Sequence, residues 1–335
     1  MKIALVHYAA APVVGGVERV MEEHSQLFAK HGHEVTVFCQ RGEGRHLPDS
    51  PEQSLFEGLG GQDIVFIHNV LTMPFQPALT EAVWKVAARL PKVRFVAWTH
   101  DVTELALPAE TRVEFVAISE LRRRELLARG VADCRVIPNG IDPARILGLP
   151  VELEKLDLLD GRLIFLHPTR LLLRKNVECG IGIVKALGDA TLVVTGAEDP
   201  HNPASKEYAQ KLREIAGSET IFANDLFPVG DAELAGFYRL ADVLMFPSRH
   251  EGFGLPLLEA RLHRLPAVYS AIEPMSGIAG AEGFPISPDE LPAEIAARLA
   301  PWLAANTAIS DRRRVLREYS WPVIYRDYIE LLLRR

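Results

Sequence analysis

The chain has 335 residues, of which 48% are hydrophobic, and this apolar content can fill the cores of about two domains. Lys and Arg total 37 against 44 Asp and Glu, which gives a formal net charge of −7. This balance excludes the overall basic field on which nucleic-acid binders depend, so any site for an anion must be local.

Three widely spaced cysteines, Cys39, Cys134 and Cys179, argue against a disulfide framework and against a cysteine-based zinc site. We therefore expect a reducing, cytoplasmic location. The first apolar stretch, 3–6, is too short for a signal peptide, and no run approaches the roughly 18 apolar residues of a transmembrane helix.

Strand-like and helix-like segments alternate through the first half of the chain. The strands are continuous apolar runs and the helices between them are amphipathic, which favours a parallel sheet covered on both faces. In chain order these segments are 3–6, 17–30, 35–39, 64–68, 79–89 and 95–99.

The same alternation returns in the second half, so the sequence predicts two Rossmann-like units. The segments are 163–166, 177–187, 191–195, 208–215, 220–222, 234–240 and 243–246. Between the halves, 137–143 has the composition of a turn and 150–160 that of a charged linker. We therefore predict an N-terminal domain at 1–147 and a C-terminal domain at 148–319, followed by an amphipathic C-terminal helix.

The loop 9–19 follows the first strand and opens a helix, which is where an open α/β sheet binds ligands. It contains Gly15 and Gly16. A glycine pair also occurs in plain flexible connections, and the GxGxxG spacing of a dinucleotide site is missing. A nicotinamide or flavin cofactor is therefore disfavoured, and we expect no cofactor.

His100 follows the strand 95–99, at the carboxyl end where cleft residues gather. A lone histidine is more often structural, but this position favours a role in the site. Asp101 either orients the imidazole or caps the next segment. For Asn139 and Gly140 a turn role is favoured over a cleft contact.

Arg170, Arg174 and Lys175 lie between a predicted strand and the start of a predicted helix. Cations at that end oppose the helix dipole unless an anion sits among them. The alternative is a solvent-facing run of charge. We favour a phosphate site, in which two fixed cations stabilise a departing nucleoside diphosphate without a metal ion.

The segment 247–260 sets Glu251 and Glu259 on either side of a glycine-bearing turn between a buried strand and a helix. Gly252 and Gly254 let the backbone approach a ligand, and free N–H groups at the helix start favour phosphates. Each carboxylate can accept paired hydroxyl groups, one from a hexose and the other from a ribose. A solvated glutamate in a turn before an ordinary helix is the plainer alternative, but the full string favours a nucleotide-sugar site.

This string closely resembles the signature of the retaining glycosyltransferases of family four, which have two Rossmann-like domains facing across a cleft, the GT-B fold. The resemblance implies that Glu251 holds hydroxyl groups of the donor sugar and Glu259 holds the nucleotide ribose. It further implies that backbone amides between them contact the diphosphate, namely those of Gly252, Phe253, Gly254 and Leu255.

Other positions take roles from the same resemblance. The loop with Gly15 and Gly16 matches one that lies over the donor diphosphate, and His100 matches a cleft histidine close to the transferred sugar. Arg170 and Lys175 are spaced as the family's phosphate-binding pair. Arg174 stands where many relatives carry Glu, so a solvated side chain is the default interpretation. In this fold the last helix, here 320–335, crosses back to the first domain.

We therefore expect a metal-independent, retaining hexosyltransferase that uses UDP-glucose or GDP-mannose and an acceptor hydroxyl. A sugar-nucleotide epimerase of the same fold and a catalytically silent nucleotide-sugar-binding protein are the alternatives. We expect no nucleic-acid partner, while peripheral contact with a membrane surface through the basic helix 121–129 stays open beside a plain solvated face. The sequence does not indicate the acceptor or the oligomeric state.

Overall fold

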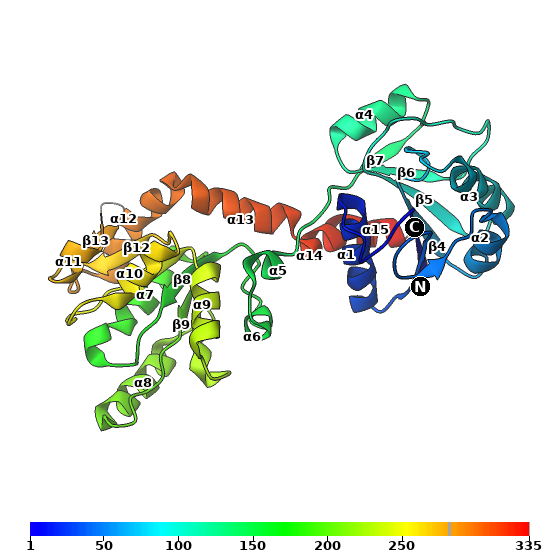
Figure 1. The fold of residues 1–335 in the computed structure, drawn as a ribbon. Coiled ribbons are helices and arrows are strands. Elements are labelled where there is room, and N and C mark those ends of the chain that lie inside the picture. Colours follow the sequence, from blue (N-terminus) through cyan, green and yellow to red (C-terminus); the bar gives the residue numbers. More distant parts are fainter. Residues whose placement is uncertain (281–282, 335) are drawn as a thin grey trace. The chain divides into compact units, whose positions relative to one another are not determined.

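The computed structural model describes residues 1–280 and 283–334, and its elements fall into two compact units (Figure 1). The first unit contains residues 1–141 and returns at Tyr319 with the C-terminal segment, while the second contains residues 142–318. The last residue of the predicted C-terminal helix, 335, lies outside the described residues.

The first unit ends at Ile141, earlier than the boundary at 147 expected from the sequence. The segment 150–160, expected as a linker, instead packs into the second unit, where Leu153 and Leu158 are buried. Gly236 permits this packing, because a Cβ atom there would lie 2.7 Å from Cδ of Pro150. The charged residues and the proline of this segment therefore belong to a part of the chain that packs on the second unit, and not to a free linker.

The first unit is built on a seven-stranded parallel sheet with the order β3-β2-β1-β4-β5-β6-β7. Its central strand β4 is buried along its whole length, as its continuous apolar sequence predicts. The strands are β1 Lys2–Val6, β2 Glu34–Cys39, β3 Arg45–His46, β4 Ile64–His68, β5 Arg94–Thr99, β6 Glu114–Ala117 and β7 Cys134–Val136.

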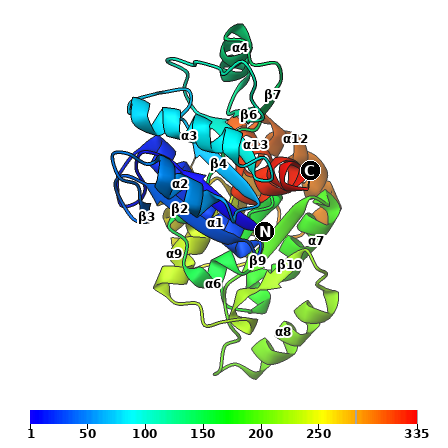
Figure 2. The ribbon, with the colours of Figure 1, turned by 90° about the vertical axis from the view of Figure 1, so that its right-hand side faces the viewer.

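Helices cover both faces of this sheet (Figures 1 and 2). The helices α2 (Glu52–Leu59) and α3 (Pro77–Arg89) enclose one core. On the other face α1 (Gly16–Lys30) shares a core with the C-terminal segment, in which α14 (Trp321–Ile324) leads through a π-helical turn, 325–329, into α15 (Glu330–Leu333). The predicted return of the C-terminal helix to the first domain is confirmed. The remaining helix of the unit is α4 (Glu120–Ala128).

The second unit has a six-stranded parallel sheet with the order β10-β9-β8-β11-β12-β13. Its strands are β8 Leu163–His167, β9 Ala190–Val194, β10 Thr220–Phe222, β11 Val243–Phe246, β12 Ala267–Ser270 and β13 Phe284–Ile286. The two parallel, helix-covered sheets confirm the predicted fold class of two Rossmann-like units.

The helices of the second unit form two layers, which Figure 2 shows on either side of the sheet. One core lies under α7, α8 and α12, and the other under α9 and α10. The helical elements are α5 Pro143–Leu147, α6 Val151–Glu154, η1 Leu173–Lys175, α7 Val177–Leu187, α8 Pro203–Ile215, η2 Ala223–Asp225, α9 Asp231–Leu240, α10 Leu255–Leu262, α11 Met275–Ile278, α12 Pro292–Ala305 and α13 Thr307–Tyr319.

The strand orders fix where ligands can be held. In the first unit β2 and β3 are added on one side of β1, and β4 to β7 on its other side. In the second unit β9 and β10 are added on one side of β8, and β11 to β13 on its other side. Loops that leave the carboxyl ends of such neighbouring strands diverge and leave a crevice. The predicted site residues lie in these loops or beside them.

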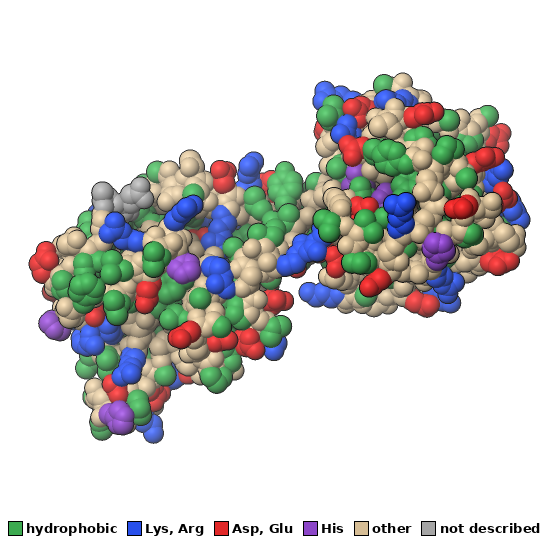
Figure 3. All heavy atoms as spheres, viewed as in Figure 1, with side chains coloured by type: hydrophobic (Ala, Val, Ile, Leu, Met, Phe, Trp, Pro, Cys, Tyr) green, Lys and Arg blue, Asp and Glu red, His purple; other side chains and the backbone are tan. Residues whose placement is uncertain are grey.

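Charged side chains of both signs are interspersed on the face shown in Figure 3. This agrees with the modest net charge of −7. Among the helices that the structure describes, none combines the length and the apolar content needed to cross a membrane.

Candidate active site

Two loops of the second unit, 168–176 after β8 and 247–254 after β11, are tied together by their backbones. The N–H of Arg249 donates to the carbonyl of Arg174 at 2.8 Å. Asn176 is in the left-handed region at φ 54°, and its amide group donates to the carbonyls of Pro247 and Pro288 at 3.1 and 3.2 Å. An Asn tolerates this conformation better than most residues. The loops therefore form one rigid platform.

A cluster of ionic side chains lies on this platform. The ammonium group of Lys175 donates to Oε1 of Glu251, and the hydroxyl of Ser248 donates to the same oxygen at 2.7 Å. Glu251 is 8% exposed and Lys175 9%. Burial lowers the pKa of Lys175, and its bond to Glu251 counteracts that shift. The structure thus brings together two predicted site residues that are far apart in the sequence.

Arg174 also belongs to this cluster. Its Nη1 atom lies 3.3 Å from Oε2 of Glu251 and donates to the carbonyl of His250 at 3.2 Å. The side chain is half-exposed, but it is not simply solvated as the default interpretation held. The pairing follows from the platform, because the backbone bond at Arg174 sets its side chain beside the second loop.

Arg170 lies elsewhere on the same unit. Its side chain is 66% exposed, and its guanidinium is 3.4 Å from a carboxylate oxygen of Asp199. The loops after β8 and β9 are close there, since a Cβ atom on Gly196 would lie 1.6 Å from the carbonyl oxygen of Thr169. The structure therefore places Arg170 beside Asp199 and does not bring it to Glu251.

The turn before α10 has the open backbone that the sequence predicts. Gly254 adopts φ 101°, a conformation that favours glycine, and a Cβ atom on Gly252 would meet no other atom. The side chains of Phe253 and Leu255 are exposed. Within the described residues, the N–H groups of Gly252 and Phe253 donate to no acceptor. They lie just before the N-terminus of α10, where the helix dipole favours an anion.

Glu259 lies one turn into α10 and is held by a residue of the neighbouring helix α9. The hydroxyl of Tyr238 donates to Oε2 of Glu259 at 2.5 Å. Tyr238 is buried, and its ring stacks on that of His263 with centroids 5.2 Å apart. Tyr238 is not among the site residues predicted from the sequence. Its residue type could have indicated a polar contact, since a tyrosine in a buried helix needs a hydrogen-bond partner for its hydroxyl.

His100 follows β5 in the first unit and is buried. Its Nε2 atom is 3.1 Å from Nδ1 of His68, and its Nδ1 atom is 3.4 Å from the amide nitrogen of Asn139. Its backbone N–H donates to Oδ1 of Asn69 at 2.7 Å. Burial lowers the pKa of His100 to about 3, so the imidazole is neutral near pH 7.

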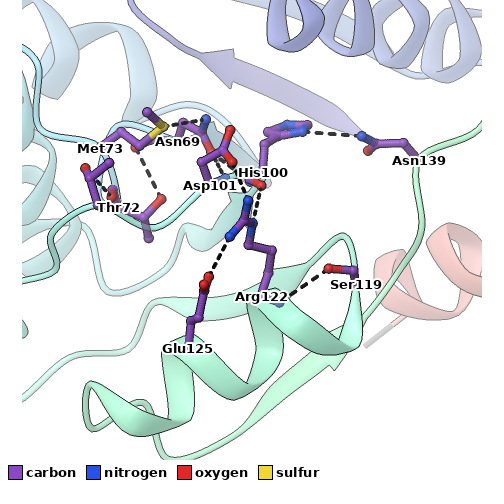
Figure 4. Close-up of polar contacts among 10 residues, drawn as sticks. Asn69, Thr72, Met73, His100, Asp101, Ser119, Arg122, Glu125 and Asn139 are labelled. Carbon is purple, nitrogen blue, oxygen red and sulfur yellow. Dashed lines mark hydrogen bonds and ion pairs between the residues drawn. The ribbon is translucent and has the colours of Figure 1, made fainter.

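The side chain of Asp101 pairs with Arg122 rather than with the imidazole of His100. Its carboxylate is 2.7 Å from the guanidinium of Arg122, which also donates to the carbonyl of His100 at 3.0 Å and to Glu125 at 2.8 Å (Figure 4). Neither alternative considered for Asp101, orienting the ring or capping the next segment, describes these contacts. They fix the loop after β5 to α4.

The glycine pair lies at the start of α1. Gly15 is the N-cap residue, and its extended backbone, φ −168°, is one that any residue adopts. A Cβ atom on Gly15 would lie 2.1 Å from a carboxylate oxygen of Glu18, whereas one on Gly16 would meet nothing. The Glu18 carboxylate is 3.8 Å from Nε2 of His7, a buried residue that directly follows β1. Gly15 therefore makes room for a carboxylate beside this histidine.

Within the described residues, no group of three or more His, Cys, Asp or Glu side chains is arranged to hold a metal ion. The charges of the second-unit cluster are instead two cations around one carboxylate.

The fold and this arrangement of side chains fit a nucleotide-sugar-dependent glycosyltransferase. Residues 14–145 match the family described as "Glycosyltransferase Family 4", and residues 164–305 match "Glycosyl transferases group 1". The chain belongs to this family of glycosyltransferases.

The chain is similar to several curated proteins. It is 26% identical to mannosylglucosylglycerate synthase of Thermotoga maritima, over 80% of each chain. It is 30% identical to D-inositol 3-phosphate glycosyltransferase of Kineococcus radiotolerans, over 67% of this chain and 58% of the relative. It is 25% identical to phosphatidyl-myo-inositol mannosyltransferase of Mycobacterium tuberculosis, over 97% of this chain and 94% of the relative.

Among solved structures, the chain is similar to sucrose-phosphate synthase from Thermosynechococcus elongatus. The identity is 18%, the TM-score is 0.40, and the match covers 99% of this chain and 98% of the other.

Proposed function

We propose that this glycosyltransferase is a retaining hexosyltransferase, which moves a hexose from UDP-glucose or GDP-mannose to an acceptor hydroxyl. The observation that carries the proposal is the contact between Lys175 and Glu251, on the platform that also presents the open amides of Gly252 and Phe253. A cation, a carboxylate and free amides in one place suit a diphosphate with a sugar attached. Two relatives have names that specify mannosyl groups, which favours mannose as the hexose.

Each charged residue takes a part in this proposal. The diphosphate binds at the start of α10, where it competes with Glu251 for Lys175. Glu251 then accepts hydrogen bonds from hydroxyl groups of the hexose. Arg170 turns from Asp199 towards the phosphates, which its exposed side chain permits. As the diphosphate leaves, Lys175 and Arg170 stabilise the negative charge that grows on it. Glu259 accepts hydrogen bonds from the hydroxyl groups of the ribose.

His100 contributes a neutral imidazole rather than a charge. Both ring nitrogens contact protein groups, so a hexose hydroxyl binds by replacing the longer contact, that between Nδ1 and the amide of Asn139 at 3.4 Å. Retention of configuration is carried over from the family resemblance. No carboxylate is assigned as a covalent nucleophile, so front-face attack by the acceptor, assisted by the leaving diphosphate, is the proposed route.

The reaction is proposed to need no metal ion, since Lys175 and Arg170 supply the positive charge that a metal would bring to the diphosphate. Transfer should then persist in excess chelator, measured as acceptor-dependent release of UDP or GDP. Loss of transfer in chelator, with recovery on adding magnesium or manganese, would contradict this part. A cytoplasmic location stays a prediction from the cysteine content.

A thermal-shift screen of UDP-glucose, GDP-mannose, UDP and GDP tests the proposal as a whole. A donor present at a hundred times its dissociation constant should add about 2.7 kcal/mol to the free energy of unfolding. Product analysis with and without acceptor hydroxyls then separates the reaction classes. Acceptor-independent epimerisation of the donor would indicate an epimerase, and binding without turnover a silent binding protein.

A further inference from the structure

Tyr238 is the partner that the structure gives to the carboxylate of Glu259. The phenol donates to Oε2 at 2.5 Å, and within the described residues no cation pairs with this glutamate. A phenol has one proton to donate, and burial is the first cause that raises the pKa of Tyr238, followed by the bond to Glu259. Tyr238 therefore stays protonated near neutral pH and remains a donor.

The ring of Tyr238 is itself held in place. It is buried on α9 and lies nearly parallel to the ring of His263, at an interplanar angle of 10°. His263 is the C-cap residue of α10, four residues after Glu259, so the two side chains lie on the same face. One tyrosine from α9 thus contacts a residue of α10 and its C-cap, and its hydroxyl has a fixed location.

This contact decides how Glu259 can meet a ligand. A carboxylate has about four acceptor positions, and the phenol occupies one on Oε2. Oε1 has no protein donor among the described residues and belongs to a partly exposed side chain. A free glutamate samples many rotamers, and ordering it on binding costs affinity. The bond from Tyr238 removes part of that cost before a ligand arrives.

We infer that Tyr238 is a positioning residue for nucleotide recognition: it holds the Glu259 carboxylate in the orientation that accepts the ribose hydroxyls. This inference rests on the proposed function, in which Glu259 binds the ribose. It adds a residue on a different helix, one that touches no ligand itself and acts only through Glu259.

The test is a pair of calorimetric titrations for each variant. UDP and GDP are compared with their 2′,3′-dideoxy analogues, and the ratio of the two dissociation constants measures the ribose contribution. Tyr238→Phe should weaken binding of the ribonucleotide about fivefold and reduce the ratio by the same factor, since only the ordering of one carboxylate is lost. Both ligands are titrated into the same sample, so the ratio does not depend on the folded fraction.

Tyr208→Phe is the matched control. Tyr208 is also buried in the second unit and also donates to a carboxylate, that of Glu178 on α7. Removing its hydroxyl should leave the ratio as in the wild type, although it costs two bonds, because this hydroxyl also accepts from the N–H of Val177 at 3.0 Å. If Tyr238→Phe does not fold, His263→Ala, which removes an exposed stacking partner, should reduce the ratio in the same direction.

Three outcomes would overturn the inference, and they differ in what else they affect. A wild-type protein that binds neither UDP nor GDP refutes the proposed function as well. A wild-type ratio near one shows that the ribose is not recognised, which removes the role of Glu259. A large wild-type ratio that Tyr238→Phe leaves unchanged refutes only the role of Tyr238 and leaves the proposed function standing.

Discussion

The two units place very different chemistry at the carboxyl edges of similar sheets. In the second unit the site is ionic, with Lys175 and Arg174 around the carboxylate of Glu251. In the first unit it is a set of buried histidines, in which His100 contacts His68. Burial keeps these imidazoles neutral by lowering their pKa values, while the second unit keeps its charges by pairing them.

This difference suggests a division of labour. A departing diphosphate needs fixed positive charge, which the ionic site offers. A sugar or acceptor hydroxyl needs uncharged hydrogen-bond donors and acceptors, which the neutral imidazole of His100 and the amide of Asn139 provide; within the described residues Oδ1 of Asn139 has no partner. Substitutions on the ionic side should therefore change the transfer rate most, and those among the histidines should change stability.

Lys175→Ala should reduce the rate of sugar transfer by about 10²-fold or more, the loss typical of removing one preorganised charge. Arg174→Ala is the matched control on the adjacent residue. It leaves Lys175 and Ser248 on Glu251, so its effect on the rate should be much smaller. Steady-state transfer kinetics of both variants decide the matter, and the reverse order would mean that the wrong cation has been assigned to the diphosphate.

The histidines make the first unit sensitive to acid. Burial lowers the pKa values of His24 and His100 to about 3 from 6.5, so the unfolded chain binds more protons below pH 6.5. The free energy of unfolding is therefore fully retained above pH 6.5 and falls as the pH drops towards 3. At pH 5 each such histidine should cost about 2 kcal/mol.

His24→Met isolates this effect. His24 is buried between Trp98 and Trp321, and within the described part of the chain its ring nitrogens have no hydrogen-bond partner. An apolar side chain can therefore replace it, and the loss of stability between pH 7 and pH 5 should shrink by about 2 kcal/mol. Urea unfolding at both pH values measures this, and an unchanged loss would show that His24 is not held neutral by burial.

The sequence predicts the fold better than it predicts the contacts in the sites. Apolar runs mark β1, β4, β8 and β11 because a buried parallel strand needs apolar residues on both faces. Lys175 and Glu251 were identified by residue type and local pattern. That they touch could not be foreseen, because their contact depends on two loops meeting from neighbouring strands.

Partners from other elements were missed for the same reason. Tyr238 reads as one more core residue of a helix, and His24 and His68 as ordinary members of apolar segments, until the packing of helices and strands shows what they face. Periodicity indicates which side chains turn inward, but it does not name the group across the interface. The segment 150–160 was misjudged in the same way. Its charged residues indicated a linker, although Leu153 and Leu158 are buried in the second unit.

The most direct test of the account separates the two glutamates of the second unit. Glu259→Gln should weaken binding of free UDP or GDP about tenfold, because an amide with one acceptor oxygen replaces a carboxylate that accepts two ribose hydroxyls. Glu251→Gln should leave that affinity nearly intact and reduce turnover, because its partners are on the transferred hexose. Calorimetric titration with the product nucleotide, together with transfer kinetics, provides both numbers for each variant. We expect this crossed pattern, and equal losses of nucleotide affinity in the two variants would contradict the assignment of Glu251 to the hexose and Glu259 to the ribose.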